Sequence, residues 1–198
     1  MTQKTFIFVG RSGSGKGTQV EFLKKYLAEK DTSRGIKSLV MGELYRNFFK
    51  EEGYVQDIAR DVSMNQGKFQ PDFLTNGLFI YNAMHVVDGV SHLFVDGYPR
   101  TIDQFEILKE LFIYTKITSP VIVEIAVSRE SVKNRMLARG RGDDSSSAID
   151  SRLDEYERAT VPMIEAMKKD PSVTYIEIDG EPSPDEIHKD IIMKLNLA

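Results

Sequence analysis

The sequence of 198 residues contains no cysteine and only three histidines. Without cysteine, disulfide bonds and thiolate-ligated zinc sites are excluded. A basic excess is missing too, because 26 Lys and Arg residues stand against 30 Asp and Glu residues, for a net charge of -4. Nucleic-acid-binding domains usually carry a basic excess. The composition therefore argues against a disulfide-stabilised fold, a zinc finger and a nucleic-acid partner.

Long hydrophobic runs are also missing. The first apolar stretch, Phe6–Val9, is too short for a secretion signal or a membrane span. No later stretch approaches the ~20 apolar residues that a spanning helix needs. We therefore expect a soluble protein without a membrane partner, cytoplasmic by default, and a chain of this length fits a single domain.

Apolar, β-rich runs alternate along the chain with segments of helical periodicity. The runs are mostly continuous, as in parallel strands that are covered on both faces. This alternation predicts a doubly wound α/β fold with right-handed crossovers. The expected strands are Thr5–Val9, Lys37–Val40, His92–Val95, Val121–Val127 and Val173–Ile178.

Two regions interrupt the alternation. Residues 42–85 hold three helical patterns, about 43–52, 55–66 and 71–85, and no strand, which predicts a helical insertion at the sheet edge. Residues 140–147 read GRGDDSSS and predict a short polar loop between two helices. Near the C-terminus, Ser183-Pro184-Asp185-Glu186 predicts a helix start with a capping box.

A glycine-rich loop follows the first expected strand and opens the first expected helix. It reads GRSGSGKGT from Gly10 to Thr18. Glycine lets the backbone approach an anion closely, and the amides of the loop and of the helix start then point at phosphate oxygens. Lys16 adds a positive charge near the β and γ phosphates. The expected ATP-binding residues of this loop are Gly13, Ser14, Gly15, Lys16, Gly17 and Thr18.

The position after the lysine is Gly17, where many such loops carry a hydroxyl that ligates Mg²⁺. We therefore expect Mg²⁺ to be held by the ATP phosphates and water, with no direct protein ligand. Asp96, which follows the apolar run His92–Val95, is the carboxylate expected to contact the ion through a water molecule.

Five motifs in order give the chain its resemblance to the adenylate kinase family. The loop ends Gly-Lys-Gly-Thr-Gln, and Asp96–Thr101 reads DGYPRT. Residues 42–46 (GELYR) and 67–72 (GKFQPD) resemble the acceptor-lobe motif and its continuation. Arg135, Arg139, residues 141–144 (RGDD) and Arg152-Leu153 resemble the lid motif. The resemblance covers nearly the whole chain.

This resemblance implies a P-loop kinase with a five-stranded parallel sheet flanked by helices, a helical acceptor lobe and a short lid. The core would comprise residues 1–40, 87–138 and 148–198, the acceptor lobe about 41–86 and the lid about 139–147. Phe48, Phe49, Phe69 and Phe73 are expected in the core of the lobe.

The resemblance also implies roles for single residues. Arg135 and Arg139 would serve ATP, with the backbone at Gly180 passing the adenine, while Arg141 and Arg152 would bridge both phosphate groups. Lys16, Arg100, Arg135, Arg141 and Arg152 are the expected catalytic set. The expected AMP-binding residues are Met41, Arg46, Lys68, Phe69, Gln70, Gly97, Arg100, Gln104, Arg141 and Arg152.

So many arginines suit phosphoryl transfer, because its loose transition state spreads charge over oxygens that positioned cations stabilise. Arginine stays charged and offers a forked donor set that matches phosphate. Arg135 and Arg139 are spaced i, i+4, which places them on one helix face. We expect a monomer that catalyses ATP + AMP = 2 ADP with Mg²⁺.

Three alternatives remain open at this point. Thr101 and Gln104 also fit a capping box, which would need Gln104 without base recognition. A UMP/CMP kinase resembles the chain as well, and Met41 stands where adenylate kinases usually carry threonine. A non-catalytic nucleotide-binding module would share the fold, although the retained Lys16 and arginines argue against it.

Overall fold

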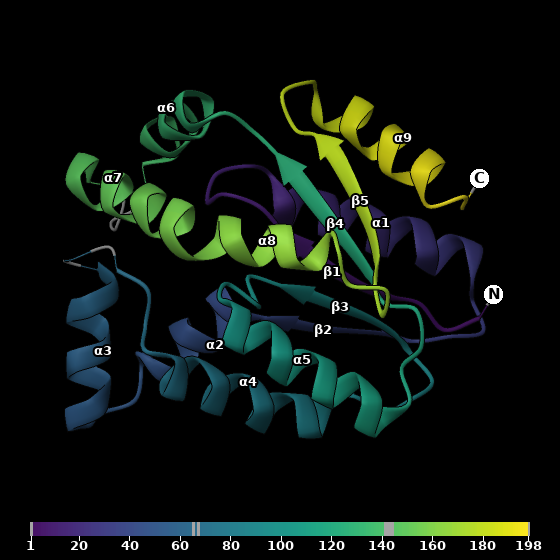
Figure 1. The fold of residues 1–198 in the computed structure, drawn as a ribbon, viewed down its shortest axis with the longest axis horizontal. Coiled ribbons are helices and arrows are strands. Elements are labelled where there is room, and N and C mark those ends of the chain that lie inside the picture. Colours follow the sequence, from purple (N-terminus) through teal and green to yellow (C-terminus); the bar gives the residue numbers. More distant parts are fainter. Residues whose placement is uncertain (1, 65, 67, 141–144, 198) are drawn as a thin grey trace.

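The computed structural model describes residues 2–64, 66, 68–140 and 145–197. A five-stranded parallel sheet lies at its centre, in the order β2-β3-β1-β4-β5 (Figure 1). Its strands are β1 (Thr5–Val9), β2 (Ile36–Val40), β3 (His92–Asp96), β4 (Val121–Ala126) and β5 (Thr174–Asp179). Each predicted strand is confirmed, with ends that differ by one residue at most.

Helices cover both faces of the sheet. They are α1 (Lys16–Lys30), α2 (Met41–Phe48), α3 (Tyr54–Met64), α4 (Asp72–Val86), α5 (Ile102–Thr115), α6 (Arg129–Arg139), α7 (Ser146–Glu155), α8 (Val161–Met167) and α9 (Pro184–Lys194). One π-helical turn, Tyr156–Thr160, joins α7 to α8. Within the described ranges, no helix combines the length and apolarity needed to cross a membrane.

Two apolar cores lie on opposite faces of the sheet, as the doubly wound prediction requires. On one face, α4, α5 and α8 pack on strand residues such as Ile7 and Val95. On the other, α1, α6, α7 and α9 pack on residues such as Phe8 and Ile125. Alternate residues of one strand thus feed different cores, which explains the continuous apolar runs of the sequence.

The first interruption of the alternation appears where the sequence predicts it, and of the second only residues 140 and 145–147 are described. Described residues between β2 and β3 form α2, α3 and α4 and no strand. In the second region, α7 begins at Ser146, before the expected end of the loop, because Ser145 caps the helix by accepting a hydrogen bond from the Ala148 amide. The predicted capping box of Ser183 and Glu186 is also confirmed.

The register of the sheet brings three strand ends together. Asp96, the last residue of β3, pairs with Phe8 of β1 and with Val40 of β2. The glycine-rich loop after β1, Gly97 after β3 and Met41 after β2 therefore leave the sheet as neighbours. Carboxyl ends of parallel strands form the usual ligand-binding edge of such a sheet.

Candidate active site

The glycine-rich loop adopts backbone conformations that suit glycine. Gly10, Gly13 and Gly15 have φ of 140°, 82° and 93°. A Cβ on Gly10 would lie 2.6 Å from the Ile125 carbonyl oxygen, and one on Gly13 would lie 2.9 Å from Met136 Cγ. Gly17 and Thr18 lie exposed in the first turn of α1. The loop is therefore held tightly against β4 and α6, with the amino end of α1 open to solvent.

Lys16 folds over this loop. Its Nζ donates to the carbonyl oxygens of Gly10 and Arg11, each at 2.8 Å, and lies 3.5 Å from the Oγ of the buried Ser14. Burial lowers its pKa from the usual 10.5 to about 8; Asp96 raises it, and Arg100 and Arg139 lower it further. A buried cation that carbonyl dipoles and other cations surround is poised for a multivalent anion.

Asp96 lies beside this lysine at the end of β3. Burial raises the pKa of its carboxyl group, and the charges of Lys16 and Arg100 oppose that rise. Its Oδ1 is buried without a hydrogen-bond partner among the described residues. Since buried polar atoms normally have partners, this oxygen fits one that accepts from a water of a hydrated cation.

The Arg100 side chain has a hydrogen bond and an aromatic contact within the site. Its Nε donates to the Gly97 carbonyl at 3.0 Å, and its guanidinium lies over the Phe69 ring, 4.9 Å from the centroid. Its main-chain carbonyl accepts from Thr160 Oγ1 at 3.0 Å. Burial lowers its pKa; Tyr45 and Asp96 raise it, and Arg152 lowers it. The Gly97 carbonyl and the Phe69 ring thus hold the guanidinium, while Thr160 contacts the main chain of the same residue.

One pocket is lined by residues of both the glycine-rich loop and the motif at Asp96–Thr101. It lies at the carboxyl ends of β1 and β3 and has the cations Lys16, Arg100 and Arg152 in its wall. Its other lining residues are Phe8, Val9, Gly10, Ser12, Phe69, Gly97, Pro99, Tyr156 and Thr160.

A second arginine contact lies on the ATP side of the expected site. Both terminal nitrogens of Arg135 donate to the Gly180 carbonyl at 3.0 Å, and one lies 3.3 Å from the Glu181 carboxylate. Arg139, one turn later at the end of α6, lies close enough to lower the pKa of Lys16. The structure thus brings together Arg135 and Gly180, which the sequence assigns to the same substrate.

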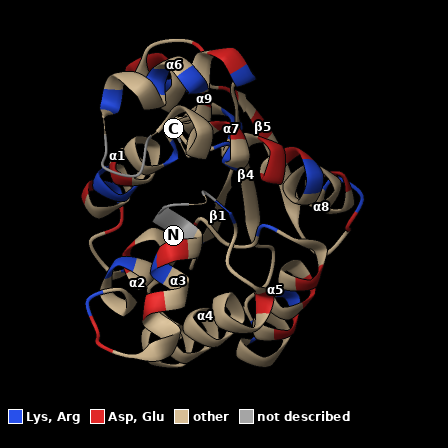
Figure 2. Ribbon diagram, turned by 90° about the vertical axis from the view of Figure 1, so that its left-hand side faces the viewer, with Lys and Arg blue, Asp and Glu red and all other residues tan. Residues whose placement is uncertain are grey.

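Basic positions occur on both sides of the site, on α6 above and on the α2 and α3 side below (Figure 2). Arg46 lies in the last turn of α2 and is exposed; it is not among the residues that line the pocket. Arg141 lies outside the described residues, as do Gly142, Asp143 and Asp144.

The other expected acceptor residues have varied surroundings. Met41 is buried, and its Cβ would lie 3.5 Å from a Cβ placed on Gly97. Lys68 is exposed, whereas the buried Gln70 donates to the Ala59 carbonyl at 2.6 Å. Gln104 is buried, and both ends of its amide have protein partners.

The capping-box interpretation of Thr101 and Gln104 is half correct. Thr101 Oγ1 accepts from the Gln104 amide at 3.2 Å, as a cap does. The Gln104 side chain, however, accepts from the amide of Arg100 instead of returning to that of Thr101.

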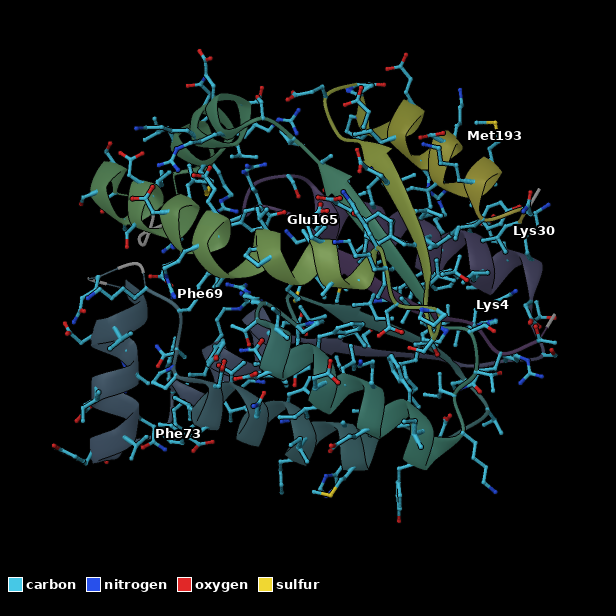
Figure 3. All side chains as sticks on the ribbon, viewed as in Figure 1. Lys4, Lys30, Phe69, Phe73, Glu165 and Met193 are labelled. Carbon is cyan, nitrogen blue, oxygen red and sulfur yellow. The ribbon has the colours of Figure 1, made fainter. Side chains whose placement is uncertain are left out.

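The aromatic prediction for the lobe needs one correction. Phe73, labelled with Phe69 in Figure 3, is 74% exposed, so it is not in the lobe core. Phe69 packs against Arg100. On the sequence alone, Phe73 is grouped with the other phenylalanines of the lobe, but the face of α4 that carries it turns to solvent. The sequence predicted no role for Thr160, Tyr156 or Asp72. Of the three, only Asp72 lies within a predicted motif, as the last residue of the one at 67–72.

A sequence model of the adenylate kinase family matches residues 8–172. The chain belongs to the adenylate kinase family. The adenylate kinase of a Nocardioides species is 32% identical over 195 residues, which cover 96% of each chain. That of Prochlorococcus marinus is 31% identical over 179 residues, 90% of this chain and 92% of the relative.

Adenylate kinase family membership agrees with the site geometry. The resemblance that the five motifs imply is confirmed, and so are the P-loop kinase fold and the assignment as a phosphotransferase. The chain is accordingly a nucleoside monophosphate kinase.

Proposed function

We propose that this kinase transfers the γ-phosphoryl group of Mg²⁺-bound ATP to AMP, reversibly and as a monomer. The observation that carries the proposal is the pocket whose wall contains Lys16, Arg100 and Arg152. A loop built for a phosphate chain and a pair of arginines suited to a second phosphate share this one space.

In the proposed reaction, an oxygen of the acceptor phosphate attacks the γ-phosphorus while the bond to the β–γ bridging oxygen breaks. Lys16 and the loop amides would hold the β and γ phosphates, and Arg100 would hold the acceptor phosphate. Arg152, close to Arg100, would meet the charge that builds on the transferred group. ATP and AMP together carry the same total charge as the two ADP products, so no proton-abstracting side chain is required.

Mg²⁺ would accompany ATP and neutralise part of the phosphate charge. Asp96 is the residue that fits it, through a water, because its Oδ1 is buried without a partner among the described residues. Arg135 and the Gly180 carbonyl would flank the adenine of ATP, with Arg139 near its phosphates. On the acceptor side, Arg46, Met41, Gln104 and the backbone at 68–70 would surround the nucleotide.

An acceptor panel tests this proposal. We expect purified protein with Mg²⁺-ATP to convert AMP at a higher kcat/KM than UMP, CMP or GMP. Lys16→Met should abolish turnover and so exclude a contaminating kinase, since it removes the loop's only lysine. A preference for UMP or CMP would replace AMP as the acceptor, and turnover that survives Lys16→Met would overturn the assignment of this pocket.

A further inference from the structure

The side-chain amide of Gln104 is held between two groups of opposite hydrogen-bonding polarity. Its Oε1 accepts from the main-chain amide of Arg100 at 2.8 Å, and its Nε2 donates to Asp72 Oδ1 at 2.6 Å. Gln104 is 3% exposed, so water competes little for either contact. The two partners come from different regions, since Asp72 begins α4 and Arg100 precedes α5.

These partners permit only one orientation of the amide. A main-chain N–H can only donate, and a carboxylate can only accept. If the amide were turned over, its NH₂ group would face the Arg100 N–H, donor against donor. Its oxygen would face the Asp72 carboxylate, acceptor against acceptor. Leaving buried polar groups mismatched in this way is strongly unfavourable. The hydroxyl of Thr101 also lies within 3.3 Å and 3.4 Å of the two Asp72 oxygens, as a second donor to the carboxylate.

We infer that Asp72 is a positioning residue that sets which hydrogen-bonding pattern Gln104 presents to the acceptor base. In the locked orientation, one N–H and one carbonyl lone pair of Gln104 have no partner among the described residues. They form a donor next to an acceptor. When Nε2 faces the ring nitrogen and Oε1 faces the exocyclic group, that pair matches an amino base, in which a ring nitrogen accepts and the adjacent amino group donates, as in adenine or cytosine. A keto base, such as hypoxanthine or uracil, has the opposite pattern.

The inference rests on the proposed function in one respect, namely that Gln104 faces the acceptor base. It does not require Asp72 to hold Arg100. The Arg100 side chain is bonded to Gly97, and its carbonyl to Thr160, independently of Asp72. Removing the Asp72 charge should therefore change the choice between bases more than the binding of the acceptor phosphate.

The test compares AMP with IMP. In IMP a carbonyl replaces the amino group of the base, and the adjacent ring nitrogen carries a hydrogen. Asp72→Asn keeps the shape of the side chain but can donate as well as accept, so Gln104 is no longer locked. We expect the ratio of kcat/KM for AMP over IMP to fall about tenfold, as one mismatched polar contact allows. The KM for ATP should not change.

Two controls make the experiment decisive. Asp103→Asn removes an exposed carboxylate from the first turn of α5 and should leave the ratio as in the wild type. In a Gln104→Met background, Asp72→Asn should have no further effect on the ratio, because Asp72 acts only through the amide. An unchanged ratio in Asp72→Asn, or an equal fall in the Gln104→Met background, would overturn the inference.

The same measurements separate this inference from the choice of acceptor. If the wild type prefers CMP to AMP, the proposed acceptor is wrong, and CMP against UMP replaces AMP against IMP as the amino and keto pair. A wild type that prefers UMP to CMP and IMP to AMP would contradict the polarity that we assign to Gln104.

Discussion

The surroundings of Lys16 disfavour its positive charge in the folded protein but favour the binding of an anion. Its ammonium group is buried beside Arg100 and Arg139, and only Asp96 opposes the resulting fall in its pKa. Burying a cation among other cations is unfavourable for the folded protein by itself. The same arrangement favours a ligand with several negative charges, because the ligand supplies the missing counter-charge. The phosphate loop is thus less stable without its substrate than it could be.

The first prediction concerns the pH dependence of ATP binding. Because burial lowers the pKa of Lys16 to about 8, the lysine loses its proton as pH rises through about 8. Bound ATP favours the charged lysine, so ATP binding should weaken progressively above that pH. The measurement is the Kd of an ATP analogue by calorimetry between pH 7 and pH 9.5.

Lys16→Arg is the matched control, since arginine keeps its charge throughout this range. Its analogue affinity, whatever its absolute value, should lack the decline above pH 8. A decline of the same size in Lys16→Arg would assign the titration to another group.

At the scale of elements, the turn from β5 into α9 is built around Gly180. Its amide donates to the Ala126 carbonyl at 2.8 Å, and its own carbonyl accepts both terminal nitrogens of Arg135. A Cβ at this position would lie 2.5 Å from Val127 Cγ2 and 2.6 Å from Ile125 Cγ2. Both neighbours are buried and β-branched, so neither can move aside easily.

The second prediction is that Gly180→Ala damages stability and ATP binding together. Overpacking of this kind typically destabilises by about 1–3 kcal/mol. The shifted carbonyl should also release Arg135, which raises the KM for ATP while the KM for AMP stays near the wild-type value. Urea unfolding and steady-state kinetics measure the two effects.

Gly77→Ala is the control for this substitution. Gly77 lies within α4, and no atom lies within 4 Å of a Cβ placed there. Alanine in a helix interior should stabilise the protein by about 0.5–1 kcal/mol. If Gly180→Ala proved as harmless as Gly77→Ala, the close packing of the β5–α9 turn would not matter for the site.

The π-helical turn at Tyr156–Thr160 shows a second way in which an element positions the site. It links α7, which carries Arg152, to α8, which packs on the sheet. Thr160, 3% exposed, ends this turn and donates to the Arg100 carbonyl. Such turns are often found at functional sites.

At the scale of the whole molecule, the proposed donor and acceptor sites come from different parts of the fold. The loop after β1, α6 and the β5–α9 turn supply the ATP side, whereas α2, the segment at 68–70 and the start of α5 supply the acceptor side. Phe69 against Arg100 is one contact that already joins the helical insertion to the sheet edge. A ligand that spans both sites should therefore stabilise more of the structure than either substrate alone.

The third prediction is a thermal shift with a two-substrate mimic, in which two adenosines are joined through a phosphate chain. At a concentration of about 100 Kd, stabilisation of about 2.7 kcal/mol is expected from binding to the folded state alone. Its Tm shift should exceed those of ATP and AMP at matched concentrations. Calorimetry with each ligand gives the comparison.

Arg152→Ala should remove most of the extra shift, because Arg152 stands between the two phosphate sites in the proposed complex. Arg158→Ala is the control, since Arg158 is an exposed arginine that pairs with Glu155 at 2.6 Å. Equal shifts with the mimic and with ATP alone would count against two phosphate sites in one pocket.

Much of the fold follows from short-range features of the sequence. The strands are mostly apolar runs, although Glu124 interrupts β4 and Glu177 interrupts β5. Ser183 with Glu186 marks a helix start without reference to any other segment. Lys16 and Arg100 could be predicted as site residues because neighbouring residues form their motifs. Periodicity, capping and phosphate-loop spacing act within a few residues, so they can be read along the chain.

Local patterns along the chain are therefore enough to predict the alternation of strands and helices, the phosphate loop and the class of reaction. The tertiary structure decided the order of the strands, the exposure of Phe73 and the partners of Arg100 and Gln104. Asp72 meets Gln104 across 32 residues of sequence, and Thr160 meets Arg100 across 60. Contacts at that separation depend on how whole elements pack, since no local propensity brings such side chains within hydrogen-bonding distance.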